Sequence, residues 1–147
     1  ISKKDFKKFH PSGNLGAKLR TVDELMLVGS KIPFVNEGVK MKKALQIISN
    51  KKLGILIVQN SKKITTGIIT DGQIRRFNEI NTDLQGLTVK KVMTINPISI
   101  DQDTLAEKAL SIMNEKEITS LCVHNKKNKK KTIGILHIHN ILHKNVH

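Results

Sequence analysis

A corner between a strand and a helix, residues 67–73, carries the side chains best suited to bind a small anionic ligand. The apolar run before it ends at Thr70, whose hydroxyl can donate or accept a hydrogen bond. A helix that begins at about Asp71 would present unpaired backbone N–H groups and the positive end of its dipole. Gly72 would let a ligand approach the backbone closely. The sequence therefore predicts contacts to a nucleotide or a sugar phosphate at this corner.

Two arginines follow the corner directly. Apart from Arg20, Arg75 and Arg76 are the only arginines in a chain whose other Lys and Arg positions are all lysine. A guanidinium group presents a planar fork that matches phosphate or carboxylate at two points, which an ammonium group does not. We expect at least one of the two to contact an anion. The alternative, a helix-surface salt bridge with Glu79, is about equally favoured by the spacing.

Three histidines near the end of the chain raise the question of a metal site. His139 and His143 are four residues apart on an expected helix and could face one ion, with His137 close by. No cysteine or acidic residue accompanies them in the sequence. We therefore predict no metal site, and ligand contact is the preferred role for His137.

The elements that position these residues belong to a chain able to fold around a core. It has 147 residues, 38% of them hydrophobic, and its longest apolar runs have the length of strands rather than of membrane-spanning helices. A single cysteine, Cys122, excludes an internal disulfide and fits a reducing, cytoplasmic setting as a small core residue. The first residue is Ile1, so we interpret the sequence as a part of a longer polypeptide.

The net charge of +14 invites a nucleic-acid or anionic-membrane interpretation, but its distribution favours neither. The lysines are scattered along the chain, and four phenylalanines without Trp or Tyr provide few surfaces for stacking bases. The densest basic run, residues 126–131, lies between two apolar segments, as a solvated hairpin turn would. We expect no specific nucleic-acid partner and no membrane partner.

An internal repeat decides the architecture. Four blocks recur at an offset of 65 to 67 residues: residues 22–26 with 89–93, 44–48 with 109–113, 53–58 with 118–123, and 67–70 with 134–137. His137 thereby occupies the position that matches Thr70. One copy is too small to bury its apolar faces alone, so two copies should pack together and form a cleft.

Each copy has the same order of expected elements. A short helix opens it, and a longer helix, two apolar strands joined by a polar turn, and a final helix follow. Capping boxes of the T-x-x-E kind are predicted at Thr21 with Glu24 and at Thr104 with Glu107. The expected strands are 55–58, 64–70, 120–124 and 132–137, and the final helices begin at about Asp71 and Ile138.

These features resemble the CBS domain pair, a tandem module that senses nucleotides and related ligands. The carriers of the resemblance are the repeated start (Val22-Asp23-Glu24-Leu25-Met26), the Ala44-Leu45-Gln46-Ile47-Ile48 helix, and the corner Gly67-Ile68-Ile69-Thr70-Asp71-Gly72-Gln73. The resemblance implies an α/β (α+β) fold, with two pseudo-symmetric β-α-β-β-α units packed through their sheets. The expected boundaries are 1–20 for the end of an upstream domain with its linker, 21–83 for the first unit and 84–147 for the second.

Within that family, the chain is similar to the C-terminal region of bacterial D-arabinose-5-phosphate isomerases of the Kdo pathway of lipopolysaccharide synthesis. The segments Ile69–Arg76, Ile135–Leu142 and Phe9–Gly16 carry this similarity. It implies an upstream sugar-isomerase domain in the full-length protein, with His10 associated with that active site. A histidine fits acid or base chemistry beside a carbonyl. In this chain alone His10 has no catalytic partners and residues 10–13 would form only a turn after a helix, so we expect this chain alone not to be an enzyme.

The resemblance also implies which residues meet a ligand. In many CBS modules the corner ends in an Asp that holds ribose hydroxyls, and Gln73 and Asn140 stand at the matching positions. An amide can hydrogen-bond a diol with one acceptor oxygen and no charge, which makes ligands of the AMP or ATP class less favoured. The expected ligand residues are Thr70, Asp71, Gly72, Gln73, Arg75, Arg76, His137, His139 and Asn140.

Two functions from different classes follow from the resemblance. The first is a regulatory module, without a required cofactor, that binds a nucleotide or sugar nucleotide such as CMP-Kdo between its repeats and modulates the attached isomerase. The second is a structural platform for oligomerisation that has no physiological ligand. A homodimer through the paired repeats is expected in either case.

Overall fold

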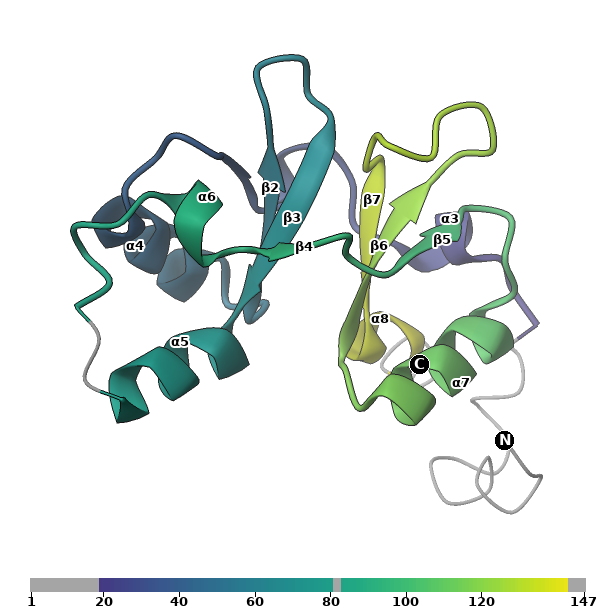
Figure 1. Cartoon of the computed structure of the whole chain (residues 1–147). Coiled ribbons are helices and arrows are strands. Elements are labelled where there is room, and N and C mark those ends of the chain that lie inside the picture. Colours follow the sequence, from purple (N-terminus) through teal and green to yellow (C-terminus); the bar gives the residue numbers. More distant parts are fainter. Residues whose placement is uncertain (1–18, 81–82, 143–147) are drawn as a thin grey trace. The chain divides into compact units, whose positions relative to one another are not determined.

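The computed structural model describes residues 19–80 and 83–142. The chain divides into two compact units, each with a small sheet and its own helices (Figure 1). The central unit is Ser30–Pro97, and the terminal unit joins Ile1–Gly29 to Ile98–His147. His10 and His143 lie outside the described residues. The mixed α/β architecture of a tandem repeat is confirmed.

The central unit is built on a four-stranded sheet of order β1-β2-β3-β4. Its strands are β1 Phe34–Asn36, β2 Ile55–Gln59, β3 Thr65–Thr70 and β4 Thr94–Ile95, and its helices are α4 Met41–Lys51, α5 Asp71–Glu79 and α6 Val89–Val92. The strands β1 and β2 run parallel, and the other neighbouring strands are antiparallel. The helix α5 follows directly on β3, so the predicted corner at Thr70 is confirmed (Figure 1).

The terminal unit repeats this plan with a three-stranded sheet of order β5-β6-β7. Its elements are α3 Val22–Leu25, β5 Ser99–Asp101, α7 Ala106–Lys116, β6 Ser120–His124, β7 Gly134–His137 and α8 Ile138–Leu142. A 3-10 turn, Gly29–Lys31, follows α3. Leu27 and Ile135 form an isolated antiparallel bridge. This bridge corresponds to the pairing of β3 with β4 in the central unit.

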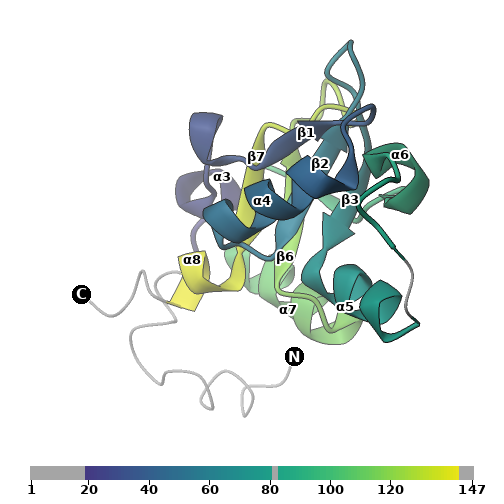
Figure 2. The same ribbon diagram turned by 90° about the vertical axis from the view of Figure 1, so that its left-hand side faces the viewer.

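Each unit has its own hydrophobic core, formed where helices cover one face of the sheet. In the central unit α4 lies over the sheet, with Met41, Ala44 and Ile48 packed among side chains of β2 and β3 (Figure 2). In the terminal unit α7 supplies Ala109, Leu110 and Met113 to an equivalent cluster, which also includes residues of β6 and β7. Both helices were predicted from apolar residues at helical spacing, and Met41, Ala44, Ile48, Ala109 and Met113 of that pattern are buried.

The opening helix of each sequence copy packs with the strands of the other copy. Val22 and Leu25 of α3 belong to the core that contains α7 and β7, whereas Val89 and Val92 of α6 belong to the core of the central unit. The compact units are therefore not two consecutive stretches of sequence. Each one combines the short helix of one copy, and the residues that directly follow it, with the longer helix, the main strands and the final helix of the other.

Backbone pairing across this exchange satisfies the first N–H groups of the helices. The Ala106 N–H donates to the Arg20 carbonyl at 2.8 Å, and the Val22 N–H donates to the Thr104 carbonyl at 2.7 Å. The central unit has the same arrangement, since Met41 donates to Leu87 and Val89 donates to Val39, each at 2.8 Å. Helix starts otherwise leave such donors without partners, so each pair of helices caps the other.

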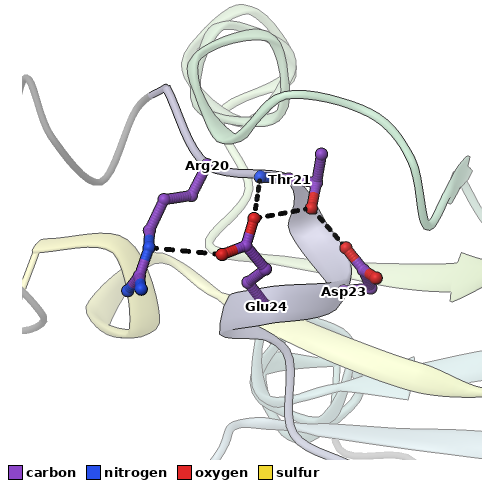
Figure 3. A network of polar contacts seen from close by, with 4 residues as sticks. All are labelled: Arg20, Thr21, Asp23 and Glu24. Atoms are coloured by element: carbon purple, nitrogen blue, oxygen red, sulfur yellow. Dashed lines mark hydrogen bonds and ion pairs between the residues drawn. The ribbon is translucent and has the colours of Figure 1, made fainter.

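The capping box predicted at Thr21 is present (Figure 3). The Glu24 carboxylate accepts from the Thr21 N–H at 3.2 Å and forms an ion pair with Arg20 at 3.4 Å. The box predicted at Thr104 is wrong. The helix α7 begins one residue later, with Leu105 at the N-cap, and its first N–H, that of Ala106, donates to the Arg20 carbonyl of a distant segment.

Cys122 is buried in β6, as its apolar neighbours predicted. Burial raises the pKa of the Cys122 thiol from 9.0 to about 12, and a hydrogen bond with Thr132 lowers it by a smaller amount. The thiol is therefore protonated in the folded chain at neutral pH. Thiolates rather than thiols react with alkylating reagents, so the folded protein should be inert to them.

This burial makes stability depend on pH at the alkaline end. Because the folded pKa lies above that of the unfolded chain, the stabilisation is complete below about pH 9 and is lost as the pH rises towards 12. We expect the free energy of unfolding to fall over that range more steeply in the wild type than in Cys122→Ala. Urea denaturation at a series of pH values measures the two slopes, and equal slopes would contradict the assignment.

The lysine-rich run forms the solvated turn expected of it. Residues 126–131 are all exposed and connect β6 to β7, and side-chain oxygens of Asn125 and Asn128 accept backbone N–H groups within the loop. Among the residues that the structure describes, no helix is both long enough and apolar enough to span a bilayer.

Candidate functional site

A pocket of about 400 Å³ lies in the central unit beside α5. Its walls are Gln73, Arg76, Phe77, Ile80, Val92, Met93 and Thr94. This volume falls within the range of ~300–1,000 Å³ that small-molecule sites occupy. Two of the predicted ligand residues, Gln73 and Arg76, line it, so we take it as the candidate site.

One wall of the pocket is a single face of α5. Its residues are Gln73, Arg76, Phe77 and the C-cap residue Ile80, which recur at the i, i+3, i+4, i+7 spacing that places side chains on one side of a helix. The opposite wall, residues 92–94, is the end of α6 and the start of β4. The fold brings these walls together because β4 pairs with β3, the strand that leads into α5.

Gln73 is held by the fold through both ends of its amide group. Its Oε1 accepts from the Thr70 N–H at 2.9 Å, and its Nε2 donates to the Val92 carbonyl at 3.3 Å. The side chain is 9% exposed and forms a capping box with Thr70. It therefore ties the start of α5 to the end of α6.

The structure separates the two arginines that the sequence left equivalent. Both side chains are exposed, but only Arg76 lines the pocket. The Arg76 Nη1 atom lies 3.5 Å from where a Cβ on Gly72 would stand, so its guanidinium group is folded back over the first turn of α5. Within the described residues neither arginine forms the salt bridge with Glu79 that was the alternative.

The remaining corner residues have local structural roles. The Thr70 hydroxyl is the N-cap of α5 and accepts from the Gln73 N–H at 3.3 Å. The Asp71 N–H donates to the Gly54 carbonyl at 3.0 Å, and its side chain is exposed. A Cβ at Gly72 would meet only ordinary contacts, so the fold itself does not require glycine there. Thr70, Asp71 and Gly72 do not line the pocket.

The cap at Thr70 provides a stability test of these assignments. We expect Thr70→Ala to lower the free energy of unfolding by about 1 kcal/mol, because the substitution removes a helix N-cap. Thr104→Ala should change it by less than about 0.5 kcal/mol, since the Thr104 side chain caps no helix. Urea denaturation compares the two, and an equal loss in both variants would contradict the assignment.

The corresponding corner of the terminal unit gathers the predicted His137, His139 and Asn140. The Asn140 Oδ1 accepts from the His137 N–H at 2.7 Å, which repeats the role of the Gln73 oxygen. The backbone N–H of His139 donates to the His137 Nδ1 at 3.1 Å, and the two imidazole rings are stacked with centroids 4.8 Å apart. Ser120, the strand partner of His137, has a buried hydroxyl oxygen without a bond to any described residue.

In the described segments, no group of three or more His, Cys, Asp or Glu side chains is arranged to hold a metal ion. A second surface depression of about 510 Å³ also lies in the central unit. It follows the exposed side of α4 and contains none of the predicted ligand residues; its walls are Lys42, Leu45, Gln46, Ser49, Asn50 and Gln85.

The sequence analysis missed most of the pocket wall. Phe77 and Ile80 could have been found from the helical spacing that starts at Gln73. Val92, Met93 and Thr94 carried no such signal, because they reach the pocket only through the pairing of β4 with β3.

The CBS domain family matches this chain at residues 22–79 and 89–147. The arabinose 5-phosphate isomerase KdsD of Escherichia coli strain K12 is 34% identical over 139 residues. That match covers 94% of this chain and 42% of the isomerase, so the chain spans less than half the length of this relative. An uncharacterised protein of Rickettsia prowazekii is also 34% identical, over 142 residues.

Solved structures share the fold at lower identity. A conserved protein from Pyrococcus horikoshii superposes with a TM-score of 0.75 and 21% identity, over 86% of this chain and 92% of that one. The structure of CBSX2 in complex with AMP gives a TM-score of 0.73 and 22% identity, over 86% and 96%; CBSX2 is a CBS-pair protein from Arabidopsis thaliana.

Proposed function

Because the chain belongs to the CBS domain family, we propose that it is the ligand-sensing regulatory part of a longer enzyme. The observation that carries this proposal is the pocket beside α5, which combines the Arg76 guanidinium with the apolar side chains of Phe77 and Val92. A concave site with an apolar lining and a few polar groups is typical of small-molecule binding. The ligand would act by binding one arrangement of the protein better than another.

The longer enzyme in this proposal is a D-arabinose-5-phosphate isomerase. Support comes from the 34% identity to the Escherichia coli isomerase, of which the chain covers 42%. Catalysis would then reside outside the described residues, with His10 contributing to it only in the full-length protein. The sensing unit alone would have no isomerase activity.

The proposed ligand is a nucleotide or a sugar nucleotide. CBSX2 was crystallised with AMP, and the CBS pair of MJ0100 with methylthioadenosine and S-adenosylmethionine, which shows that this fold accepts nucleoside ligands in other proteins. For an isomerase that supplies the Kdo pathway, CMP-Kdo is the candidate effector, because an activated end product is suited to feedback control. We retain adenine nucleotides as a less favoured class.

A thermal-shift screen tests the sensor function directly. Wild-type protein is heated with adenine nucleotides, cytidine nucleotides, CMP-Kdo and arabinose 5-phosphate, since a ligand that binds only the folded state raises the melting temperature. Selective stabilisation by one class supports a sensor and identifies what it senses. The absence of any shift at millimolar ligand would reject the sensor function.

An oligomerisation platform without a physiological ligand is the second candidate. It is favoured by large exposed apolar residues in the central unit, Ile80 at 70% and Ile95 at 63%, because exposed apolar patches often mark protein contacts. This function requires a stable dimer without ligand. A monomer in analytical ultracentrifugation at tens of micromolar protein would reject it.

A further inference from the structure

The amide of Gln73 is the group expected to hold a ribose diol, yet the fold already uses both of its ends. Its oxygen accepts from the Thr70 N–H, and its nitrogen donates to the Val92 carbonyl. The side chain is also nearly buried, at 9% exposure. If it turned towards a ligand, the Thr70 N–H and the Val92 carbonyl would lose these bonds, at a cost comparable to what a diol would return.

The other polar groups of the pocket are suited to an anion rather than to a sugar diol. Among the described residues that line it, none is Asp or Glu, and Arg76 supplies the only formal charge. No described carboxylate forms an ion pair with Arg76, so no salt bridge has to be broken before its guanidinium group binds an anion. The Arg76 Nη1 atom lies beside Gly72, whose substitution by a larger residue would bring a side chain against it.

We propose that this pocket selects its ligand through a phosphate or carboxylate group held by Arg76. Gln73 is a structural residue in this proposal and does not hydrogen-bond a ribose. The apolar wall of Phe77, Ile80 and Met93 would cover the uncharged part of the ligand. The inference rests on the proposed sensor function and specifies the ligand class at the same site. A phosphorylated sugar or a nucleotide satisfies it, and an unphosphorylated nucleoside does not.

The first test separates the anion from the rest of the ligand. Isothermal titration of the wild-type chain uses cytidine, CMP, arabinose 5-phosphate and free Kdo, which separate the nucleoside, the phosphate and the carboxylate. We expect CMP or another of the anions to bind at least roughly 10-fold more tightly than cytidine, because a charge-assisted hydrogen bond contributes about 1.5–3 kcal/mol. Cytidine that binds as tightly as CMP would overturn the inference and leave the sensor function standing.

Two matched arginine variants locate the anion. Arg76→Gln should weaken binding of the anionic ligand by roughly 10- to 100-fold. Arg75→Gln removes the same charge from an exposed neighbour outside the pocket and should change the affinity less than about 2-fold. Equal losses in the two variants would overturn the role of Arg76, because they would show a response to net charge alone.

Gln73→Glu tests the structural role of the amide. A carboxylate keeps the bond from the Thr70 N–H but cannot donate to the Val92 carbonyl, so the melting temperature should fall while cytidine binding stays weak. Tighter cytidine binding in this variant would show that residue 73 reads the diol, and would overturn the inference. If no compound binds the wild type at all, the sensor function fails together with it.

Discussion

The substitution Gly67→Ala is expected to lower the free energy of unfolding by about 1–3 kcal/mol, the usual cost of an overpacked site. A Cβ at Gly67 would lie 2.7 Å from the Met93 sulfur and 2.7 Å from the Thr94 carbonyl oxygen. The sulfur can move aside, but the carbonyl belongs to β4, which pairs with β3 at this point. The backbone would have to shift, and with it one wall of the candidate pocket.

Two other glycines provide a graded control for this experiment. Gly86→Ala should be nearly neutral, because nothing lies within 4 Å of its Cβ position. Gly134→Ala, at the matching position of the terminal unit, meets the movable Met26 side chain and the Leu27 carbonyl at 3.1 Å, so its loss should be intermediate. Urea denaturation ranks the three. A Gly67→Ala variant as stable as Gly86→Ala would show that β4 does not pack closely against Gly67.

The largest expected loss of stability is that of Leu110→Ala, about 2–5 kcal/mol. Leu110 is 0% exposed and lies in the core of the terminal unit, where α7 packs on the sheet. Truncation removes its buried methyl groups and leaves a cavity that the packed neighbours can fill only in part. Thermal and urea denaturation, followed by circular dichroism, measure the loss.

Leu105→Ala is the matched control for that variant. Leu105 is 44% exposed and serves as the N-cap of α7 through its backbone, which alanine retains. We expect a change below about 0.5 kcal/mol. A comparable loss in both variants would mean that α7 does not bury the face assigned to it.

The comparison of Gln73 with Arg76 shows why a motif alone does not define a binding site. The sequence placed both residues in one ligand-binding group because both follow the corner at Thr70. In the structure both residues line the pocket, but the Gln73 amide is bonded to Val92, which is 19 positions away in the chain, whereas Arg76 forms no ion pair with a described carboxylate. The distinction depends on a partner that no local pattern indicates.

The exchange of the opening helices also determines where the segment that begins at Arg20 is attached. Backbone hydrogen bonds join this segment to the rest of the terminal unit. Ala106 donates to Arg20, Val22 donates to Thr104, and Leu27 donates to Ile135.

The repeat, the two longer helices, the four main strands and the capping box at Thr21 were predictable from the sequence. These features depend on neighbours along the chain: apolar side chains at helical or alternating spacing, and a hydroxyl three residues before a carboxylate. Such patterns are visible without a fold. The resemblance that they carry also identified the family.

Only the tertiary structure decided which helix packs with which sheet, where α7 begins, and which residues line the pocket. The strands β1 and β5 have three residues each, too few for a period to be recognised. At the start of α7 the Ala106 N–H is bonded to the carbonyl of Arg20, and the pocket wall is completed by the pairing of β4 with β3. Each of these depends on a hydrogen bond between segments distant in the chain, and residue types alone do not specify such partners.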